Sequence, residues 1–240
     1  MYSFIYSRLI SITSIVFFLN FNNLFAQDYQ IKLWEIPVGY AKIISTSDDE
    51  MHLNLKSNSI IDLVFPVELK FSSRFNDKSF SILENKKTAL QGKNKQKYTA
   101  KLMNKTELIY DTKDTVVVEP NTLSLLSFLK KIKQTPANDI DGRWQNLENE
   151  GKLYQVRLLW NDTTMVKLSN QSILCDHYRI DVNLSNDKNQ IFDKTDYFNE
   201  LFFNINSIRQ IWVERWQKQP RIVKLSIKND QKNLLLVLKD

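Results

Sequence analysis

The sequence predicts a mainly β protein, a strongly curved antiparallel sheet or barrel-like single domain with one internal α-helix. Three observations lead to this fold class. Apolar and polar side chains alternate one by one over most of the chain, which is the period of a half-buried strand. Clusters of Asn, Asp and Lys separate these segments at the short spacing of an antiparallel meander. Only one segment has helical periodicity, so the regular alternation of strands and helices typical of a parallel sheet is missing.

The composition is that of a folded protein and excludes several classes. Of 240 residues, 42% are hydrophobic and 25% are charged, which argues against disorder. There are only four glycines, which argues against glycine-rich phosphate-binding loops. The sole cysteine, Cys175, has no partner for a disulfide within the chain, and a chain of this length does not need one to form a core.

Residues 1–26 have the pattern of an export signal. Arg8 precedes an apolar run over residues 9–19, which is shorter than the about 20 residues needed to span a bilayer. We expect cleavage after Ala26 and a periplasmic or otherwise exported location. Leu24 is larger than the small residue preferred three places before such a cut, so retention of the segment as an N-terminal anchor is the alternative.

The remaining residues, 27–240, are predicted to form one domain of basic character without affinity for nucleic acid. They contain 32 basic and 27 acidic side chains. Only eight residues in the whole chain are arginine, the better reader of phosphate, and the lysines are scattered singly through alternating segments. The densest lysine run, over residues 86–101, is interpreted as a hairpin or loop with exposed flanks.

The first half is predicted to be entirely β. Met51, Leu53 and Leu55 fall on one face of a strand, with polar residues between them. A second segment, residues 67–72, repeats this alternation. The strands expected in this half are residues 30–36, 39–45, 51–56, 67–72, 78–83, 96–103, 106–110 and 115–118.

One helix is predicted over about residues 121–133. Asn121 is a suitable N-cap, Pro120 and Pro136 mark the two ends, and lysines in the last turn suit the negative end of the helix dipole. An apolar stripe that includes Phe128 follows helical spacing. We expect this helix to plug or cover one open end of the curved sheet, and the polar stretch over residues 134–144 to be a loop.

Alternation resumes in the second half. We expect Leu174, Tyr178, Ile180 and Val182 to share one face of a strand, with Asp176 as a polar exception on that face. No stretch has the composition of a linker between domains. The strands expected here are residues 154–160, 174–182, 201–205, 208–216, 221–227 and 233–238.

The arrangement resembles the DUF3108 family, exported β-rich bacterial envelope proteins of uncharacterised function. The resemblance spans most of the chain after the signal and implies an exported barrel-like fold. It supplies no catalytic residues, and its motifs are sheet positions and one helix entry. The segments that carry it are Val38-Gly39-Tyr40-Ala41, Phe71-Ser72-Ser73-Arg74-Phe75 with Phe80-Ser81-Ile82, Val118-Glu119-Pro120-Asn121-Thr122-Leu123-Ser124-Leu125-Leu126, and Ile211-Trp212-Val213 with Pro220-Arg221-Ile222-Val223-Lys224-Leu225.

Catalytic candidates in the sequence are weak. Cys175, Asp176 and His177 are adjacent, but neighbouring strand residues point to opposite faces and do not converge on one atom. The carboxylate groups lie in expected turns, at 48–50, 139/141 and 193/196, where acids usually bond their own backbone. No nucleophile elbow, zinc-protease or dinucleotide fingerprint is present. We therefore expect no enzyme activity, no cofactor and no metal.

The aromatic residues near the C-terminus are the more informative binding candidates. Trp212 and Trp216 lie four residues apart, on one face if the segment is a strand, and Arg215 and Arg221 lie close to them. Such a platform could stack on a ring while the guanidinium groups hold an anion. The alternative is that the indoles fill the core or rim of the sheet, which we favour for Trp212. Phe128 is the candidate lining residue from the helix.

The leading functional hypothesis is a non-enzymatic envelope protein that binds or carries a hydrophobic, lipid-like ligand inside the curved sheet. The rival is a structural or interaction protein whose barrel is solid and which docks another envelope protein. A hydrolase acting through His177 is a third and weaker hypothesis. No transmembrane span is expected once the signal is removed.

Overall fold

The computed structural model describes residues 25–186, 191–192, 194–217 and 219–239. The predicted signal segment therefore lies outside the described residues, except for Phe25 and Ala26, which begin the first strand. Cleavage after Ala26 stays a prediction. Among the described residues, no helix is long and apolar enough to cross a membrane.

The fold is a single antiparallel sheet of fourteen strands that curls without closing. This confirms the predicted fold class. The strands follow one another in the sheet from β8 back to β1, then from β14 back to β9, so the first and last strands of the chain are neighbours and β8 and β9 are the two edges. In order, they are β1 (Phe25–Leu33), β2 (Ile36–Ser45), β3 (Glu50–Ser57), β4 (Val67–Phe75), β5 (Ile82–Gln91), β6 (Asn94–Met103), β7 (Glu107–Tyr110), β8 (Thr115–Val117), β9 (Gln145–Asn149), β10 (Lys152–Lys167), β11 (Ser172–Asn186), β12 (Ile208–Glu214), β13 (Arg221–Lys228) and β14 (Asn233–Leu238).

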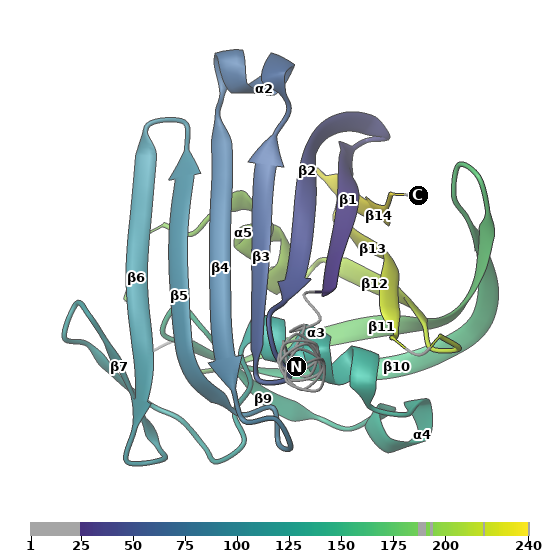
Figure 1. Ribbon diagram of the computed structural model, residues 1–240. Helices are drawn as coiled ribbons and strands as arrows, with labels where there is room; N and C mark the ends of the chain where they lie inside the picture. The colour runs from purple at the N-terminus through teal and green to yellow at the C-terminus, as the bar shows by residue number, and fades with distance from the viewer. Residues whose placement is uncertain (1–24, 187–190, 193, 218, 240) are drawn as a thin grey trace, which may run out of the picture.

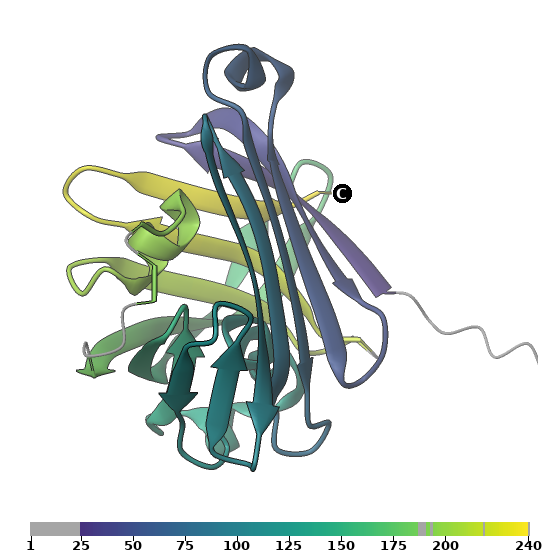
Figure 2. The same cartoon turned by 90° about the vertical axis from the view of Figure 1, so that its left-hand side faces the viewer.

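Strand alternation places the apolar side chains inside the curl. Leu53 of β3 lies opposite Phe71 of β4, and Leu55 lies opposite Leu69, and all four are buried. Figure 2 shows the steep strands β1 to β6 forming one wall and the strands β11 to β14 crossing behind them as the other. The interior between these walls is the main hydrophobic core.

Four short helices complete the described chain, where the sequence predicted one. They are α2 (Ser59–Val64), α3 (Leu125–Gln134), α4 (Ala137–Ile140) and α5 (Tyr197–Phe203). α3 packs against β3, β4 and β9 at one end of the curl, and α2 projects at the opposite end (Figure 1). The predicted loop over residues 134–144 contains α4.

The predicted helix exists but begins later than residue 121. Asn121 has a positive φ of 63°, and Ser124 is the N-cap, paired with Ser127 in a capping box. The backbone just before the cap is hydrogen-bonded to β9 instead: Leu123 N donates to Asn146 O, and Leu123 O accepts from Glu148 N. This bridge joins the segment after β8 to β9, at the opposite edge of the sheet, and holds Leu123 out of the helix.

Residues 201–205 form the end of α5 and the following turn, so the predicted strand there is wrong. Asp196 caps the helix by accepting from Phe198 N and Asn199 N. The buried residues Phe198, Leu201 and Phe202 are spaced three and one apart, which suits one helix face and not a strand. Asp196 as an N-cap was the signal for this helix.

One strand in each half of the chain also differs from the prediction. The strand expected at 78–83 is a turn followed by β5, which begins at Ile82. The lysine run 86–101 is the β5–β6 hairpin, as one of its two interpretations proposed. β9 was not predicted.

The long β10–β11 hairpin bends away from the rest of the sheet, as Figure 1 shows at its right side. The register shifts between Trp160 and Asp162, and burial on β11 then changes parity. Cys175 and Ile173 are buried near the tip, whereas Tyr178 and Ile180 are buried further along, so Leu174 is exposed and does not share the face predicted for it.

Candidate functional site

An apolar pocket opens between the curled sheet and α5, at the end of the curl opposite α3. Its cavity volume is about 410 Å³. Inward-facing residues of β1, β3, β4 and β14 form the sheet side, and α5 forms the facing wall with Phe198 and Leu201. The main sheet residues are Ile31, Leu55, Val67, Leu69 and Leu234.

Aromatic side chains frame the mouth of this pocket. Phe65, which follows α2, meets Tyr197 edge to face, with ring centroids 6.3 Å apart. Trp34, in the β1–β2 turn, also lines the pocket and is more than half exposed. Indole and phenol rings at a boundary between apolar space and water are common, because one end of each ring system is apolar and the other forms hydrogen bonds.

The polar groups of the pocket lie at its rim. The ammonium of Lys232 stands 4.2 Å from the ring centroid of Tyr197 and 3.3 Å from a carboxylate oxygen of Glu200. Lys56 and Ser57 line the rim on the sheet side, and the Ser57 hydroxyl donates to Asp62. An apolar interior with cationic groups at the entrance fits an amphiphile whose polar end stays outside.

A buried ionic cluster holds α5 in place behind the pocket. Lys87 points inward from β5 and its ammonium forms ion pairs with Glu150 and with Asp196, the latter at 2.5 Å. The side chain of Asn199 donates to Glu150 at 3.0 Å. Since Asp196 caps α5 and Asn199 lies in its first turn, the cluster fixes the N-terminal end of the helix that supplies Phe198 and Leu201 to the pocket wall.

Glu148 lies beside this cluster, and its carboxyl group has a raised pKa. Its carboxylate accepts from the Tyr110 hydroxyl and from Gly151 N. Burial nevertheless raises the pKa of Glu148 to about 7, because the hydrogen bonds only partly offset the cost of removing the charge from water. A polar hollow of about 290 Å³ lies nearby, with Glu150 and Asn199 among its walls.

The predicted tryptophan platform does not form. β12 ends at Glu214, so Trp216 follows in a loop and is exposed, while Trp212 is buried, as favoured for it. Trp212 stacks instead on His177, with ring centroids 4.3 Å apart and planes 4° apart, and the ammonium of Lys224 lies 4.4 Å from its ring centroid.

These three side chains line a groove of about 590 Å³ between the β10–β11 hairpin and the outward-facing residues of β13 and β14. Nδ1 of His177 lies 3.0 Å from a carboxylate oxygen of Asp162. The imidazole therefore faces the outer groove and not the apolar pocket.

The two predicted arginines bind groups of the chain itself. Arg215 donates to Asp176 at 3.0 Å and to the carbonyl of Thr135 at 2.6 Å, so it ties the end of α3 to β11. Arg221 pairs with the buried Glu214 at 2.6 Å. Phe128 is fully buried in the core on α3 and does not line the apolar pocket.

The Cys175, Asp176 and His177 side chains are held in three different contacts. Burial raises the pKa of the Cys175 thiol to about 12, which disfavours the nucleophilic thiolate. Asp176 accepts from Arg215, whereas His177 stacks on Trp212. Among the described residues, no group of three or more His, Cys, Asp or Glu side chains is arranged to hold a metal ion.

Sequence reasoning missed the residues that matter most here. The wall residues Phe198 and Leu201 were assigned to no site, because α5 was not recognised. Lys87 was interpreted as one exposed lysine among many. Its signal was positional: Lys87 shares strand parity with Ala89, an inward position on β5.

Comparison with known proteins supports the fold and gives no activity. No family model matches the sequence, and no curated protein matches it. The crystal structure of a beta-barrel-like protein of domain of unknown function DUF1849 from Brucella abortus has a similar fold, with a TM-score of 0.59 at 8% sequence identity. The match covers 89% of this chain and 94% of that chain. The resemblance to DUF3108 stays a prediction.

Proposed function

We propose that this protein binds a hydrophobic small molecule in the apolar pocket. It serves as a carrier or receptor for this molecule and does not convert it chemically. The observation that carries the proposal is the pocket itself, with its apolar walls and a volume of about 410 Å³. Small-molecule sites commonly enclose roughly 300 to 1,000 Å³, are mostly apolar, and contain few polar groups.

The rim chemistry narrows the ligand class to an amphiphile with a negatively charged or polar head, such as a fatty acid. The apolar chain would lie between β1, β3, β4 and α5, and the head would lie at the mouth near Lys56 and Lys232. The pocket walls include no histidine and no cysteine, which favours binding over catalysis. An exported location, which the sequence predicts, would place this binding in the cell envelope.

The test is uptake of a fluorescent fatty acid, used below its critical micelle concentration, together with native mass spectrometry of gently purified protein. Val67 lies half-buried in the pocket wall, so Val67→Trp should fill the cavity and weaken binding at least tenfold. Ile44→Trp is the matched control, because Ile44 is half-buried on β2 of the same sheet and does not line the pocket.

Circular dichroism would establish that both variants fold. Equal affinity of the wild-type protein and Val67→Trp would refute the assignment of the site. A wild-type protein that takes up no fluorescent fatty acid and carries no apolar molecule in native mass spectra would refute the proposed function, and would favour the rival hypothesis of an interaction protein.

A further inference from the structure

We propose that the pocket end of the molecule docks on an anionic lipid bilayer through an apolar tip, formed by α2 and the β1–β2 turn. The tip is defined by four exposed residues, Trp34, Ile36, Leu63 and Val64. Its use for loading or releasing a ligand rests on the proposed function, whereas the docking itself does not.

Packing explains only part of the apolar sequence of α2, because Ile61 lines the pocket whereas Ile60, Leu63 and Val64 face solvent. The helix reads Ser-Ile-Ile-Asp-Leu-Val, and none of its six residues is buried. Leu63 and Val64 are 88% and 87% exposed, and Ile60 is 74% exposed. Scattered single apolar residues on a surface need no explanation, but a contiguous group marks an interaction site.

Hydrogen bonds join α2 to the neighbouring turns, so the tip is one surface. The Asn58 amide donates to Val38 O and its side chain donates to Pro37 O, which ties the start of α2 to the start of β2, next to Ile36. On the other side, Gly92 N of the β5–β6 turn donates to Pro66 O. Figure 1 shows α2 projecting beyond the other elements at this end, with the β5–β6 turn beside it.

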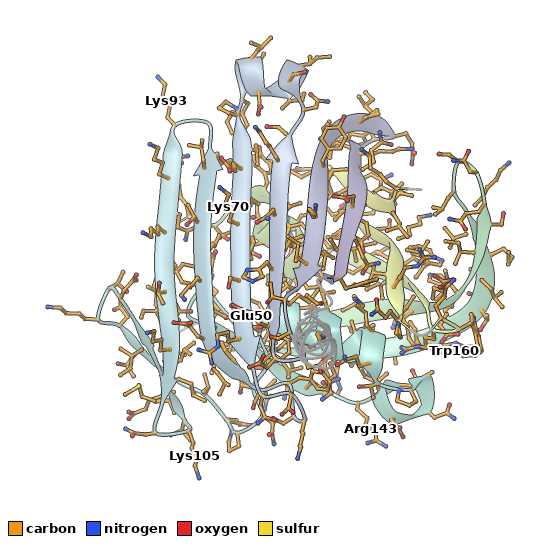
Figure 3. The ribbon with its side chains drawn as sticks, in the orientation of Figure 1. Glu50, Lys70, Lys93, Lys105, Arg143 and Trp160 are labelled. Carbon is orange, nitrogen blue, oxygen red and sulfur yellow. The ribbon has the colours of Figure 1, made fainter. Side chains whose placement is uncertain are left out.

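The charge around the tip suits a negatively charged surface. Lys56, Lys93 and Lys95 are exposed there, and Lys56 lies opposite Glu68 in the β3–β4 pairing, where it helps to lower the pKa of that carboxyl group. Figure 3 shows the Lys93 side chain extending past the end of β5 and β6. Three acidic side chains of this end pair with lysines, Glu35 with Lys32, Glu68 with Lys70 and Glu200 with Lys232, whereas Asp62 of α2 accepts from the neutral Ser57 hydroxyl and keeps its charge. The six lysines named here outnumber these four acids and Asp230 of the β13–β14 turn, so this end carries a small net positive charge.

This combination is the one that interfacial lipid binding requires. Apolar side chains enter the boundary between headgroups and acyl chains, aromatic rings lie at headgroup level, and lysines contact anionic lipids. Trp34, Phe65 and Tyr197 supply the rings, and they also frame the pocket mouth. A bilayer contacted by the tip would therefore face the entrance of the pocket. A second copy of this chain would bring like charges together, which disfavours it as the occupant.

The experiment is cosedimentation of the full protein with vesicles of phosphatidylglycerol and phosphatidylethanolamine, and with vesicles of phosphatidylcholine alone. We expect binding to the anionic vesicles that weakens as salt is raised, and at least tenfold weaker partitioning for Leu63→Ser/Val64→Ser. Lys93→Gln/Lys95→Gln should lower binding to anionic vesicles several-fold. Val117→Ser/Ile205→Ser is the matched control, because both residues are similarly exposed but lie on β8 and after α5.

Fatty-acid uptake by the same variants separates this proposal from the proposed function. The tip residues Leu63 and Val64 do not line the pocket, so their replacement should leave uptake of monomeric fatty acid unchanged. Vesicle binding without fatty-acid uptake would support the docking proposal and refute the proposed carrier function. Equal vesicle partitioning of the wild-type protein and the tip variant would overturn the docking proposal. A dimeric wild-type protein together with a monomeric tip variant would also overturn it, because the tip would then bind a second copy of the chain.

Discussion

Replacing Lys87 with methionine is expected to destabilise the protein severely, because it removes an ammonium group that pairs with two buried carboxylates. The Lys87 side chain is fully buried and contacts both Glu150 and Asp196, which are themselves almost inaccessible to water. Methionine preserves most of the volume and the unbranched shape of the chain, so the loss isolates the charge. Two negative groups would then remain in the interior without a counterion.

The expected magnitude follows from the burial of all three partners. Breaking a buried ion pair by removing one member costs about 3–5 kcal/mol, because the remaining charge is left without compensation. Whole domains have unfolding free energies of only about 5–15 kcal/mol. Lys87→Met should therefore lower the unfolding free energy by a large fraction of the total. Lys86→Met, on the adjacent and exposed position of β5, removes a surface pair with Glu84 and should cost about 1 kcal/mol or less.

Equilibrium urea unfolding at pH 7.5, followed by tryptophan fluorescence, measures both variants. Adding Asp196→Asn to Lys87→Met tests the cause, because asparagine keeps the N-cap of α5 but removes one negative charge. The double variant should be more stable than Lys87→Met alone. A loss for Lys87→Met no larger than that for Lys86→Met, or a purely additive double variant, would show that the ion pairs contribute little to stability.

Two further predictions concern Glu148 and Gly39. Burial raises the pKa of Glu148 to about 7 from an ordinary value of 4.5, so the folded state holds a proton that the unfolded chain has released. This stabilisation is complete below about pH 4.5 and is lost as the pH rises through 7. In Glu148→Gln, which mimics the protonated side chain, the fall in unfolding free energy between pH 5 and pH 8 should be much smaller than in the wild type, and an identical pH profile would argue against a protonated Glu148. At Gly39, a Cβ would lie 2.4 Å from the Lys56 carbonyl oxygen, so Gly39→Ala should cost about 1–3 kcal/mol in urea unfolding, and an unchanged midpoint would contradict this packing.

Strand periodicity predicted the sheet because most strands bury one face and expose the other. Met51, Leu53 and Leu55 alternate with polar residues, and all three lie inside the curl. The helix was located by its apolar stripe and its lysine-rich last turn. Its start was misplaced, because the backbone bridge between Leu123 and β9 is a tertiary contact that no local pattern encodes.

The pattern failed where the two sides of a strand exchange roles. On β11, the bend of the hairpin changes which face is buried between Cys175 and Tyr178, so Leu174 was placed inside although it is exposed. On β5, the inward position of Lys87 looks polar and therefore exposed. Only the ionic partners on the β9–β10 turn and at the start of α5 make its burial possible, and these lie 63 and 109 positions away along the chain.

The sequence predicted an apolar binding site inside the curved sheet but not the residues that line it. A sheet with more strands than one packed layer needs was expected to enclose a cavity, and the apolar pocket has this character. Its facing wall comes from α5, where the sequence predicted a strand, so Phe198 and Leu201 were missed. The residues proposed in their place, Arg215 and Arg221, are engaged in structural contacts instead.

The seam between β8 and β9 has a consequence for the width of the molecule. In a closed barrel, the number of strands and their stagger fix the diameter. Here the sheet has two edges, β8 and β9. A backbone bridge between Leu147 of β9 and Leu123, which follows β8 in the chain, and the hydrogen bond from Tyr110 of β7 to Glu148 of β9 link its two ends. The separation of β8 from β9 is therefore set by these few contacts and not by a ladder of backbone hydrogen bonds. A change of width at this seam would leave the thirteen strand pairings of the sheet intact.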